Sequence, residues 1–309
     1  MSKVMVSLLL GVVAVGNIFA AHHPFVDGAE ADVCVKVVDD LGEPVGGASV
    51  SVVFMTDVQK VDVVKGTSDA EGSFRAARNC IGEIRLEVRK EGYYDTKKTI
   101  TVFEFQPVET TAKSRRWKDG SIDLGVVLKK KRHPIRMAFH AVDFKPFPAT
   151  NEVLKLDLET LEWCPPFGSG RHDDLHLVFD GGRNPLDWDD FHEHLKVSFP
   201  NCVDGFYELK SDATSAFRYA HQANADGKYA RSLEFRSVHT RDGLTESTKL
   251  PADTYLIYRV RTETNELGQV VHAHYGRIGE KFRQNVGLSL RSWFNPTAND
   301  TNLEDARPR

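Results

Sequence analysis

One short stretch of the sequence concentrates the residue types that bind metals and move protons. HDDLHLVFDGGRNPLDWDDFHEH, from His172 to His194, holds four histidines and seven carboxylates within 23 residues. Imidazole and carboxylate groups are the usual protein ligands of zinc and of calcium. The stretch therefore raises the hypothesis of a metal-dependent site, which depends on how its side chains are distributed over the elements that carry them.

The alternation within this stretch predicts two β-strands with one wet face. In LHLVFD the apolar residues Leu175, Leu177 and Phe179 share one face, which leaves His176 and Asp180 on the other. HLKVSF follows the same rule. If the two strands pair in antiparallel fashion, Asp180 lies near His194 and His176 lies about four residues further along, more than about 10 Å away. This distance argues against one metal site that uses all four histidines.

A smaller metal site remains possible at the end of this stretch. A divalent cation such as zinc or calcium could be held there by carboxylates and by two histidines on one strand face. The stretch matches no EF-hand loop, which needs carboxylates at fixed alternate positions around a central glycine that is absent here. A solvated acidic loop is the favoured interpretation. No other cofactor is indicated. The candidate ligands are Asp187, Asp189, Asp190, His192 and His194.

A second pair of histidines, in the sequence HAH, points to a different chemistry. Alternation in YLIYRVR places Arg259 and Arg261 on one strand face, and a hairpin through NELG would bring them beside His272 and His274. Cations beside imidazoles oppose metal binding and suit an anion such as a carboxylate or a sulfated sugar. An exposed strand face of mixed charge is the favoured alternative.

Three tryptophans beside predicted loops offer a carbohydrate-binding hypothesis. The flat rings of Trp163, Trp188 and Trp293 could stack on sugars, although tryptophans lie more often in a core. The sequence contains no G-x-S-x-G, no P-loop, no dinucleotide fingerprint and no H-E-x-x-H. Convergence of Asp173, Asp174 and Glu193 into a paired-carboxylate hydrolase is left open by the sequence.

The beginning of the chain predicts export. Residues 1–20 place Lys3 ahead of an apolar run that ends before a polar break and Ala20, the pattern of a secretory signal peptide. The run is short for a membrane span, and no later segment is apolar enough to be one. Removal of Lys3 leaves 39 basic and 44 acidic side chains, a net charge of −5, which argues against nucleic-acid binding. We expect a secreted or periplasmic protein.

Four cysteines in an exported chain favour disulfides. Their spacing suggests one bridge between Cys34 and Cys80 and another between Cys164 and Cys202. Sequence alone allows other pairings, and free buried thiols remain an alternative.

The pattern of short alternating runs and turns predicts an all-β protein of two antiparallel β-sandwich domains. Residues 31–132 form the first, an immunoglobulin-like sandwich, and residues 133–309 form a second, jelly-roll-like sandwich. The segment HPIRMAFHAVDFKPFPATNE, which follows Arg132, is rich in proline and is predicted to be a linker. The C-terminal DARPR is predicted to be frayed.

The turns of the first domain carry a family pattern. Within VVDDLGEPVGGASVSV, TSDAEGSFR and EVRKEGYYDTKKTITV, residues 31–132 resemble the carboxypeptidase regulatory-like domain, a transthyretin-like or prealbumin-like sandwich. The resemblance implies a fold and an accessory module attached to other proteins. The matching residues are Gly42, Pro44, Val45, Gly47, Ala48, Val50, Thr67, Asp69, Gly72, Phe74, Lys90, Gly92 and Tyr93.

The resemblance carries no enzymatic activity to this chain. The peptidases that gave the family its name bind zinc through H-x-x-E, and no histidine here is followed three positions later by glutamate. The lysine to asparagine isopeptide of related adhesin modules is not supported either, because the residues before Tyr93 differ. The second half resembles exported bacterial proteins that pair such a domain with another sandwich and have no assigned activity.

These observations favour a non-catalytic exported protein that binds a ligand or assembles at the cell surface, with polysaccharide or another envelope component as the partner. The first alternative is a metal-dependent hydrolase with its site around His172–His194. The second is a structural envelope protein.

Overall fold

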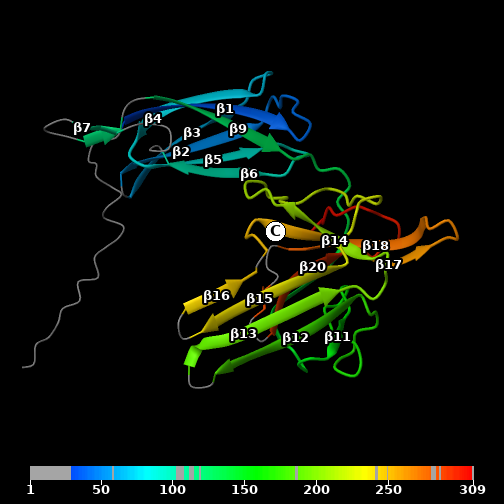
Figure 1. The fold of residues 1–309 in the computed structure, drawn as a ribbon. Coiled ribbons are helices and arrows are strands. Elements are labelled where there is room, and N and C mark those ends of the chain that lie inside the picture. The colour runs from blue at the N-terminus through cyan, green and yellow to red at the C-terminus, as the bar shows by residue number, and fades with distance from the viewer. Residues whose placement is uncertain are drawn as a thin grey trace, which may run out of the picture. The chain divides into compact units, whose positions relative to one another are not determined.

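The fold is that of a computed structural model, which describes residues 29–307 except for 58, 102–107, 111–114, 118–119, 185–186, 241–242, 249, 280–282 and 285–286. The expected signal peptide, residues 1–20, lies outside the described residues. Throughout the described part of the chain the secondary structure is strands and turns, without a helix (Figure 1). The prediction of an all-β protein with antiparallel sandwiches is confirmed. No helix capable of crossing a membrane occurs among these residues.

The chain divides into two compact units. The first comprises residues up to Lys90 together with Thr96–Leu128, and the second comprises Glu91–Asp95 and Lys129–Arg309. The sequence placed the division between residues 132 and 133.

The first unit pairs a three-stranded sheet with a four-stranded sheet, beside a short two-stranded ribbon. The pairing of β1 with β9 is parallel, and the other pairs are antiparallel. The three-stranded sheet has the order β4 (Ser73–Cys80), β1 (Ala29–Asp39) and β9 (Gly120–Leu128). The four-stranded sheet has the order β3 (Lys60–Thr67), β2 (Ser49–Asp57), β5 (Glu83–Arg89) and β6 (Thr96–Thr101), and the ribbon joins β7 (Val108–Thr110) to β8 (Arg115–Trp117).

Alternating side chains from both sheets fill the core of this unit. Val33 and Val35 of β1 and Val52 and Phe54 of β2 are fully buried, as expected for strands with one face in a core. At the turn before β4 a glycine is required, because Gly72 has a φ of +76° and a Cβ there would collide with the carbonyl oxygen of Val37.

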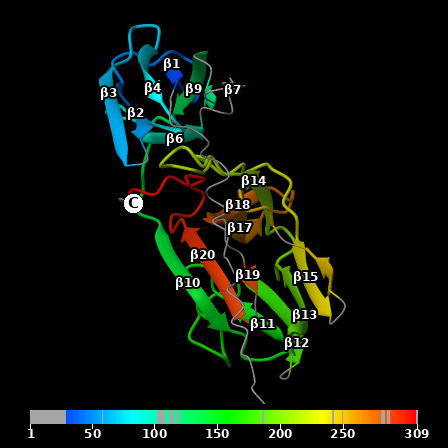
Figure 2. The same ribbon diagram turned by 90° about the vertical axis from the view of Figure 1, so that its left-hand side faces the viewer.

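The second unit is a sandwich of two five-stranded sheets with the short strand β19 (Arg283–Gln284) added to one of them (Figures 1 and 2). The first sheet has the order β10 (Ala138–Pro146), β20 (Gly287–Phe294), β18 (Val270–Ile278), β17 (Thr254–Thr264) and β14 (Gly205–Lys210). The second has the order β11 (Val153–Leu156), β12 (Leu175–Asn184), β13 (Asp187–Ser198), β15 (Ser232–Thr240) and β16 (Gly243–Ser247).

The inner faces of these sheets meet in one hydrophobic core. Leu177 and Leu195 of the second sheet pack with Tyr258 and Phe294 of the first. The outer face of the first sheet holds a smaller core, in which Trp293 packs with residues from the segment that follows β14. Both faces of the first sheet are therefore covered, whereas the second sheet exposes one polar face.

The predicted hairpin of β12 and β13 is confirmed in its register. Asp180 lies opposite His194, and His176 lies opposite Ser198. Leu175, Leu177 and Phe179 are buried together, as the alternation predicted.

Two predictions about irregular segments are wrong. The expected linker after Arg132 contains β10, an edge strand of the first sheet that pairs with β20. The expected frayed tail is bound to the sandwich as far as Arg307: Ala306 donates its N–H to the carbonyl of Ile135 at 2.7 Å, and the guanidinium of Arg307 lies 4.7 Å from the ring centre of Phe139. Backbone pairing and cation–π contact override the polar composition of these segments.

The expected disulfides are absent, since all four cysteines are free thiols. Cys34 lies opposite Arg75 on β4, whereas Cys80 lies opposite Ala29, so the two thiols are five residues apart along the pair of strands, about 17 Å. Disulfides require Cα atoms within about 7 Å. Cys164 is buried with its thiol 3.2 Å from the carbonyl oxygen of His172, whereas Cys202 is exposed.

Candidate functional site

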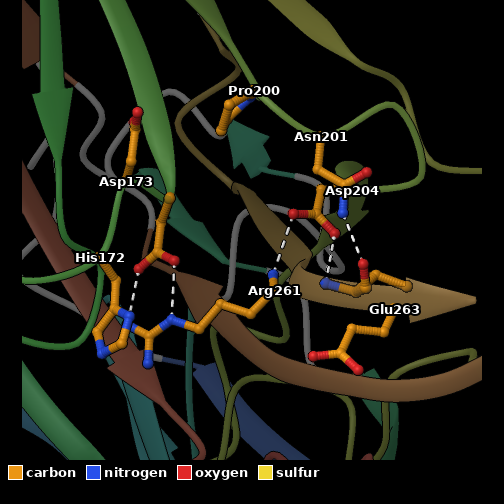
Figure 3. A pocket seen from close by; sticks show the side chains of 9 residues that line it. His172, Asp173, Pro200, Asn201, Asp204, Arg261 and Glu263 are labelled. Carbon is orange, nitrogen blue, oxygen red and sulfur yellow. Dashed lines mark hydrogen bonds and ion pairs between the residues drawn. The ribbon is translucent and has the colours of Figure 1, made fainter.

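A pocket of about 490 Å³ opens where three polar segments of the second unit meet (Figure 3). One segment precedes β12, another joins β13 to β14, and the third is the end of β17. The lining residues are His172, Asp173, Asp174, Pro200, Asn201, Asp204, Arg261, Thr262 and Glu263. The pocket thus draws on residues about 90 positions apart in the chain, from His172 to Glu263.

A bulge in β17 sends Arg261 into this pocket. The register of β17 against β18 shifts between Val260 and Glu263, and Arg261 has a φ of +55°, a left-handed conformation that is rare for residues other than glycine. The carboxylate of Asp204 accepts the backbone N–H groups of Arg261 and Thr262, each at 3.0 Å. Asp204 therefore stabilises the bulge that inverts the expected side-chain alternation.

The guanidinium of Arg261 is held by three carboxylates from the segment between β11 and β12. It donates two hydrogen bonds of 2.9 Å to Asp174, one of 2.9 Å to Glu159 and one of 3.3 Å to Asp157. Its plane also lies 4.6 Å from the ring centre of Phe294 in the core between the sheets. Arg261 thus ties the two sheets together at the end of the sandwich, in the geometry that suits bidentate carboxylate binding.

Buried negative charge exceeds buried positive charge around Arg261. The side chains of Asp157 and Asp174 are only 1% exposed, and Asp204 is also buried. Burial raises the pKa of Asp174 above its usual range, although Arg261 opposes that change, and burial likewise raises the pKa of Asp204. Arg261, Asp157, Glu159, Asp174 and Asp204 are called the Arg261 cluster below.

The prediction that Arg259 and Arg261 share an anion site with two histidines is wrong, because neither arginine is available for an anion there. Arg259 stays on the outer face of its sheet, where it donates to the carbonyls of Val203 at 2.7 Å and Ala225 at 2.8 Å and packs over the ring of Tyr229. Arg261 points to the inner face and is neutralised by carboxylates. The bulge separates the two arginines that a regular strand would align.

The two histidines of HAH do lie together, on β18. Their ring centres are 5.3 Å apart, and His274 stacks on Phe294 and places Nδ1 3.1 Å from the carbonyl oxygen of Asn295. Burial lowers the pKa of His274, and the positive charge of Arg261 contributes to that direction. His272 lies opposite Glu263.

The candidate metal ligands of the opening stretch all belong to β13. His192 and His194 share the outer face of the sheet, where Nε2 of His194 is 3.7 Å from a carboxylate oxygen of Glu234. Among the described residues no group of three histidine, cysteine, aspartate or glutamate side chains could hold a metal ion. Asp187 and Asp190 belong to the same strand, and the side chains of Asp189 and Trp188 lie outside the described residues.

The other two candidate sugar-stacking tryptophans are core residues. Trp163 is 5% exposed and Trp293 is 8% exposed. Trp163 packs in the core between the sheets, and Trp293 lies in the smaller core, 4.6 Å from the guanidinium of the fully buried Arg277. The prediction of exposed rings for sugar binding is wrong for this pair, because strand packing covers them.

Two of the three carboxylates for which the sequence left a hydrolase pair open lie close together. Asp173 and Asp174 line the pocket, whereas Glu193 is buried at another place, opposite Gly181 of β12. Sequence reasoning missed Asn201, Asp204 and Glu263. The turn residues of NCVDG, between β13 and β14, were the available signal for the first two.

No family model matches this sequence. No curated protein matches it either. Among solved structures, 3-chlorocatechol 1,2-dioxygenase from Rhodococcus opacus 1CP shares 11% identity over 33% of this chain and 60% of its own, with a TM-score of 0.26.

Two further structures are similar to the same low degree. Catechol 1,2-dioxygenase from Acinetobacter radioresistens shares 11% identity over 34% of this chain and 53% of its own, with a TM-score of 0.27. The dioxygenase domain of a dioxygenase carbohydrate-binding protein fusion from Streptomyces sp. SirexAA-E shares 13% identity over 32% of this chain and 80% of its own, with a TM-score of 0.23. The chain thus spans less than two thirds of the two catechol dioxygenases, and none of these likenesses carries a functional argument.

Proposed function

We propose that this protein is an exported binding protein that holds a carbohydrate in the pocket beside Arg261 and catalyses no reaction. The observation that carries the proposal is the convergence of hydrogen-bond acceptors from three segments on one pocket of about 490 Å³. Pockets of roughly 300–1,000 Å³ with a few fixed polar groups are typical of small-molecule sites. The hydrogen bonds of the Arg261 cluster fix the floor of the pocket before any ligand arrives.

The lining chemistry favours a hydroxyl-rich ligand. Carboxylates accept hydrogen bonds from hydroxyl groups, and such charge-assisted bonds are stronger than neutral ones. Glu263 is exposed at the pocket, and Asp173 lies on the same rim. Because carboxylates outnumber cations here, a neutral glycan or one with amino groups fits the pocket better than a sulfated or uronic one.

The remaining support comes from the sequence. The signal-peptide pattern of residues 1–20 favours secretion or a periplasmic location, where polysaccharides and other envelope components are the available partners. The resemblance of residues 31–132 to the carboxypeptidase regulatory-like domain favours an accessory rather than a catalytic role.

Glycan binding with one isosteric variant tests this proposal. Glu263→Gln removes a pocket charge and keeps the shape, so we expect affinity for a glycan found by array screening to fall about tenfold, the effect of one charge-assisted hydrogen bond of about 1.5 kcal/mol. Glu208→Gln, at an exposed residue of β14 outside the pocket, is the matched control and should bind as the parent does. Isothermal titration calorimetry gives both affinities. An array without any bound glycan, or equal loss in both variants, would overturn the proposal.

A further inference from the structure

We propose that the Arg261 cluster takes up a proton when the second unit folds, so that mild acidification strengthens this end of the sandwich. The inference concerns the protein alone and holds whatever ligand the pocket takes. It rests on an imbalance in the cluster. The guanidinium of Arg261 binds Asp157, Glu159 and Asp174, and Asp204 accepts the backbone N–H of the same residue, so the net charge is 1 − 4 = −3 if all four carboxyls are ionised.

Burial makes that imbalance costly. The side chains of Asp157 and Asp174 are 1% exposed, and that of Glu159 is 37% exposed. Water therefore solvates only one of the three carboxylates that bind the guanidinium. Like charges confined in such a site disfavour the ionised form of a buried carboxyl. In the unfolded chain the same carboxyls separate and lose their protons at ordinary pH values.

Other charged groups around the cluster do not remove the surplus. Asp173 and Glu263, which line the same pocket, add negative charge. Lys155 and His176 contact Asp173 rather than the cluster. Within the part of the chain that the structure describes, the titratable groups near the cluster also include His172 on the rim, His272 and His274 on β18, and Cys164 and Tyr258.

The sign of the effect follows from the pKa directions. The pKa values of Asp174 and Asp204 are raised in the folded protein, chiefly by burial, from an ordinary value of 3.8. Their contribution to stability is therefore lost as the pH rises through the raised values and is restored as the pH falls toward 3.8. His274 acts in the opposite direction, because its lowered pKa removes stability as the pH falls below 6.5.

The experiment is urea unfolding of the full chain at a series of pH values between neutrality and mild acid, followed by the fluorescence of the buried tryptophans of the second unit. The informative quantity is the slope of the free energy of unfolding against pH, because this slope gives the number of protons taken up on folding. The slope is compared between the parent and the variants Glu159→Gln and Asp174→Asn. The parent's folding equilibrium constant should gain up to about tenfold per pH unit from this cluster for each proton taken up. Both variants should lose that gain, because each removes one negative charge.

Glu208→Gln is the control, since it deletes an exposed carboxylate away from the cluster and should keep the parental slope. A slope in Glu159→Gln that equals the parental slope would overturn the proposal, and so would the same change of slope in Glu208→Gln. Asp174→Asn also weakens the hydrogen bonds to Arg261 and is expected to unfold at a lower urea concentration, whereas Glu159 is 37% exposed and its amide variant keeps the experiment decisive. Because the charge of Glu159 raises the pKa of His274, the slopes of all the proteins are compared in a His274→Gln background, in which the opposing effect of the imidazole is absent.

Discussion

The polar outer face of β12 and β13 and the Arg261 cluster both bring carboxylates near groups that carry positive charge, but they differ in how they are assembled. On the outer face, His176, Asp180 and His194 follow one another along two strands, so each side chain has water on one side. In the cluster, the carboxylates of Asp157 and Asp174 are brought from the segment between β11 and β12 to a single guanidinium and are almost completely buried.

This difference shows that a site forms where side chains from distant segments point to one place, and not where polar residues are most frequent in the sequence. Side chains two residues apart on a strand are about 7 Å apart and point in parallel, so they spread charge over a surface. Loops at the end of a sandwich instead direct side chains from distant positions toward a common point. The 23-residue stretch with the most histidines and carboxylates therefore contributes only His172, Asp173 and Asp174 to the pocket.

The two regions should differ most in stability when an arginine is removed from each. Arg261→Met leaves Asp157 and Asp174 buried without their cation, so we expect the free energy of unfolding to fall by about 3–5 kcal/mol. Arg236→Met, an exposed arginine opposite His194 on the polar face, should change it by less than about 0.5 kcal/mol. Urea denaturation measures both. Similar losses would show that the two regions do not differ in energy.

A smaller loss of stability is expected when Asp204, which accepts backbone N–H groups of the bulge, is removed. Asp204→Ala deprives the N–H groups of Arg261 and Thr262 of their acceptor, which should cost about 1–3 kcal/mol. The matched change on the polar face is Asp180→Ala, for which we expect less than about 0.5 kcal/mol because Asp180 is exposed. Thermal unfolding of the two variants gives the ranking. A neutral Asp204→Ala would mean that the bulge persists without its carboxylate.

The smallest effect is expected on the polar face itself. Replacing both His192 and His194 with alanine should alter stability by less than about 0.5 kcal/mol, since the imidazoles lie on a solvated strand face. Elemental mass spectrometry should find the same metal content in parent and variant, and chelator should leave the melting temperature unchanged. Stoichiometric zinc or calcium that disappears in the variant would restore the metal hypothesis for β13.

Much of the strand architecture was predictable because it depends on local alternation. The register of Asp180 against His194 followed from apolar residues at every second position and one intervening turn. β10 was not predictable in the same way. The segment 133–152 that contains it has three prolines and a mixed composition that resemble a linker, and only the pairing of β10 with β20 at the sheet edge makes it a strand.

The pocket was less predictable than the strands. Alternation placed Arg261 beside Arg259, and the sequence of β17 contains no glycine or proline to signal the bulge at Arg261. The bulge exists because Asp204, 57 positions away, accepts its N–H groups. Such a contact has no local signature, since its two partners meet only when the loop before β14 packs against the end of β17.

The sequence by itself determined an all-β chain, the runs that become strands, and the faces of those strands that are buried, because these depend on side-chain periodicity and turn residues. Only the tertiary structure decided that Cys34 and Cys80 lie apart, that Trp163 and Trp293 are covered, and that Arg261 is surrounded by carboxylates. Those outcomes depend on distances between segments far apart in the chain, and such distances are set by the packing of sheets rather than by the residues of any one strand.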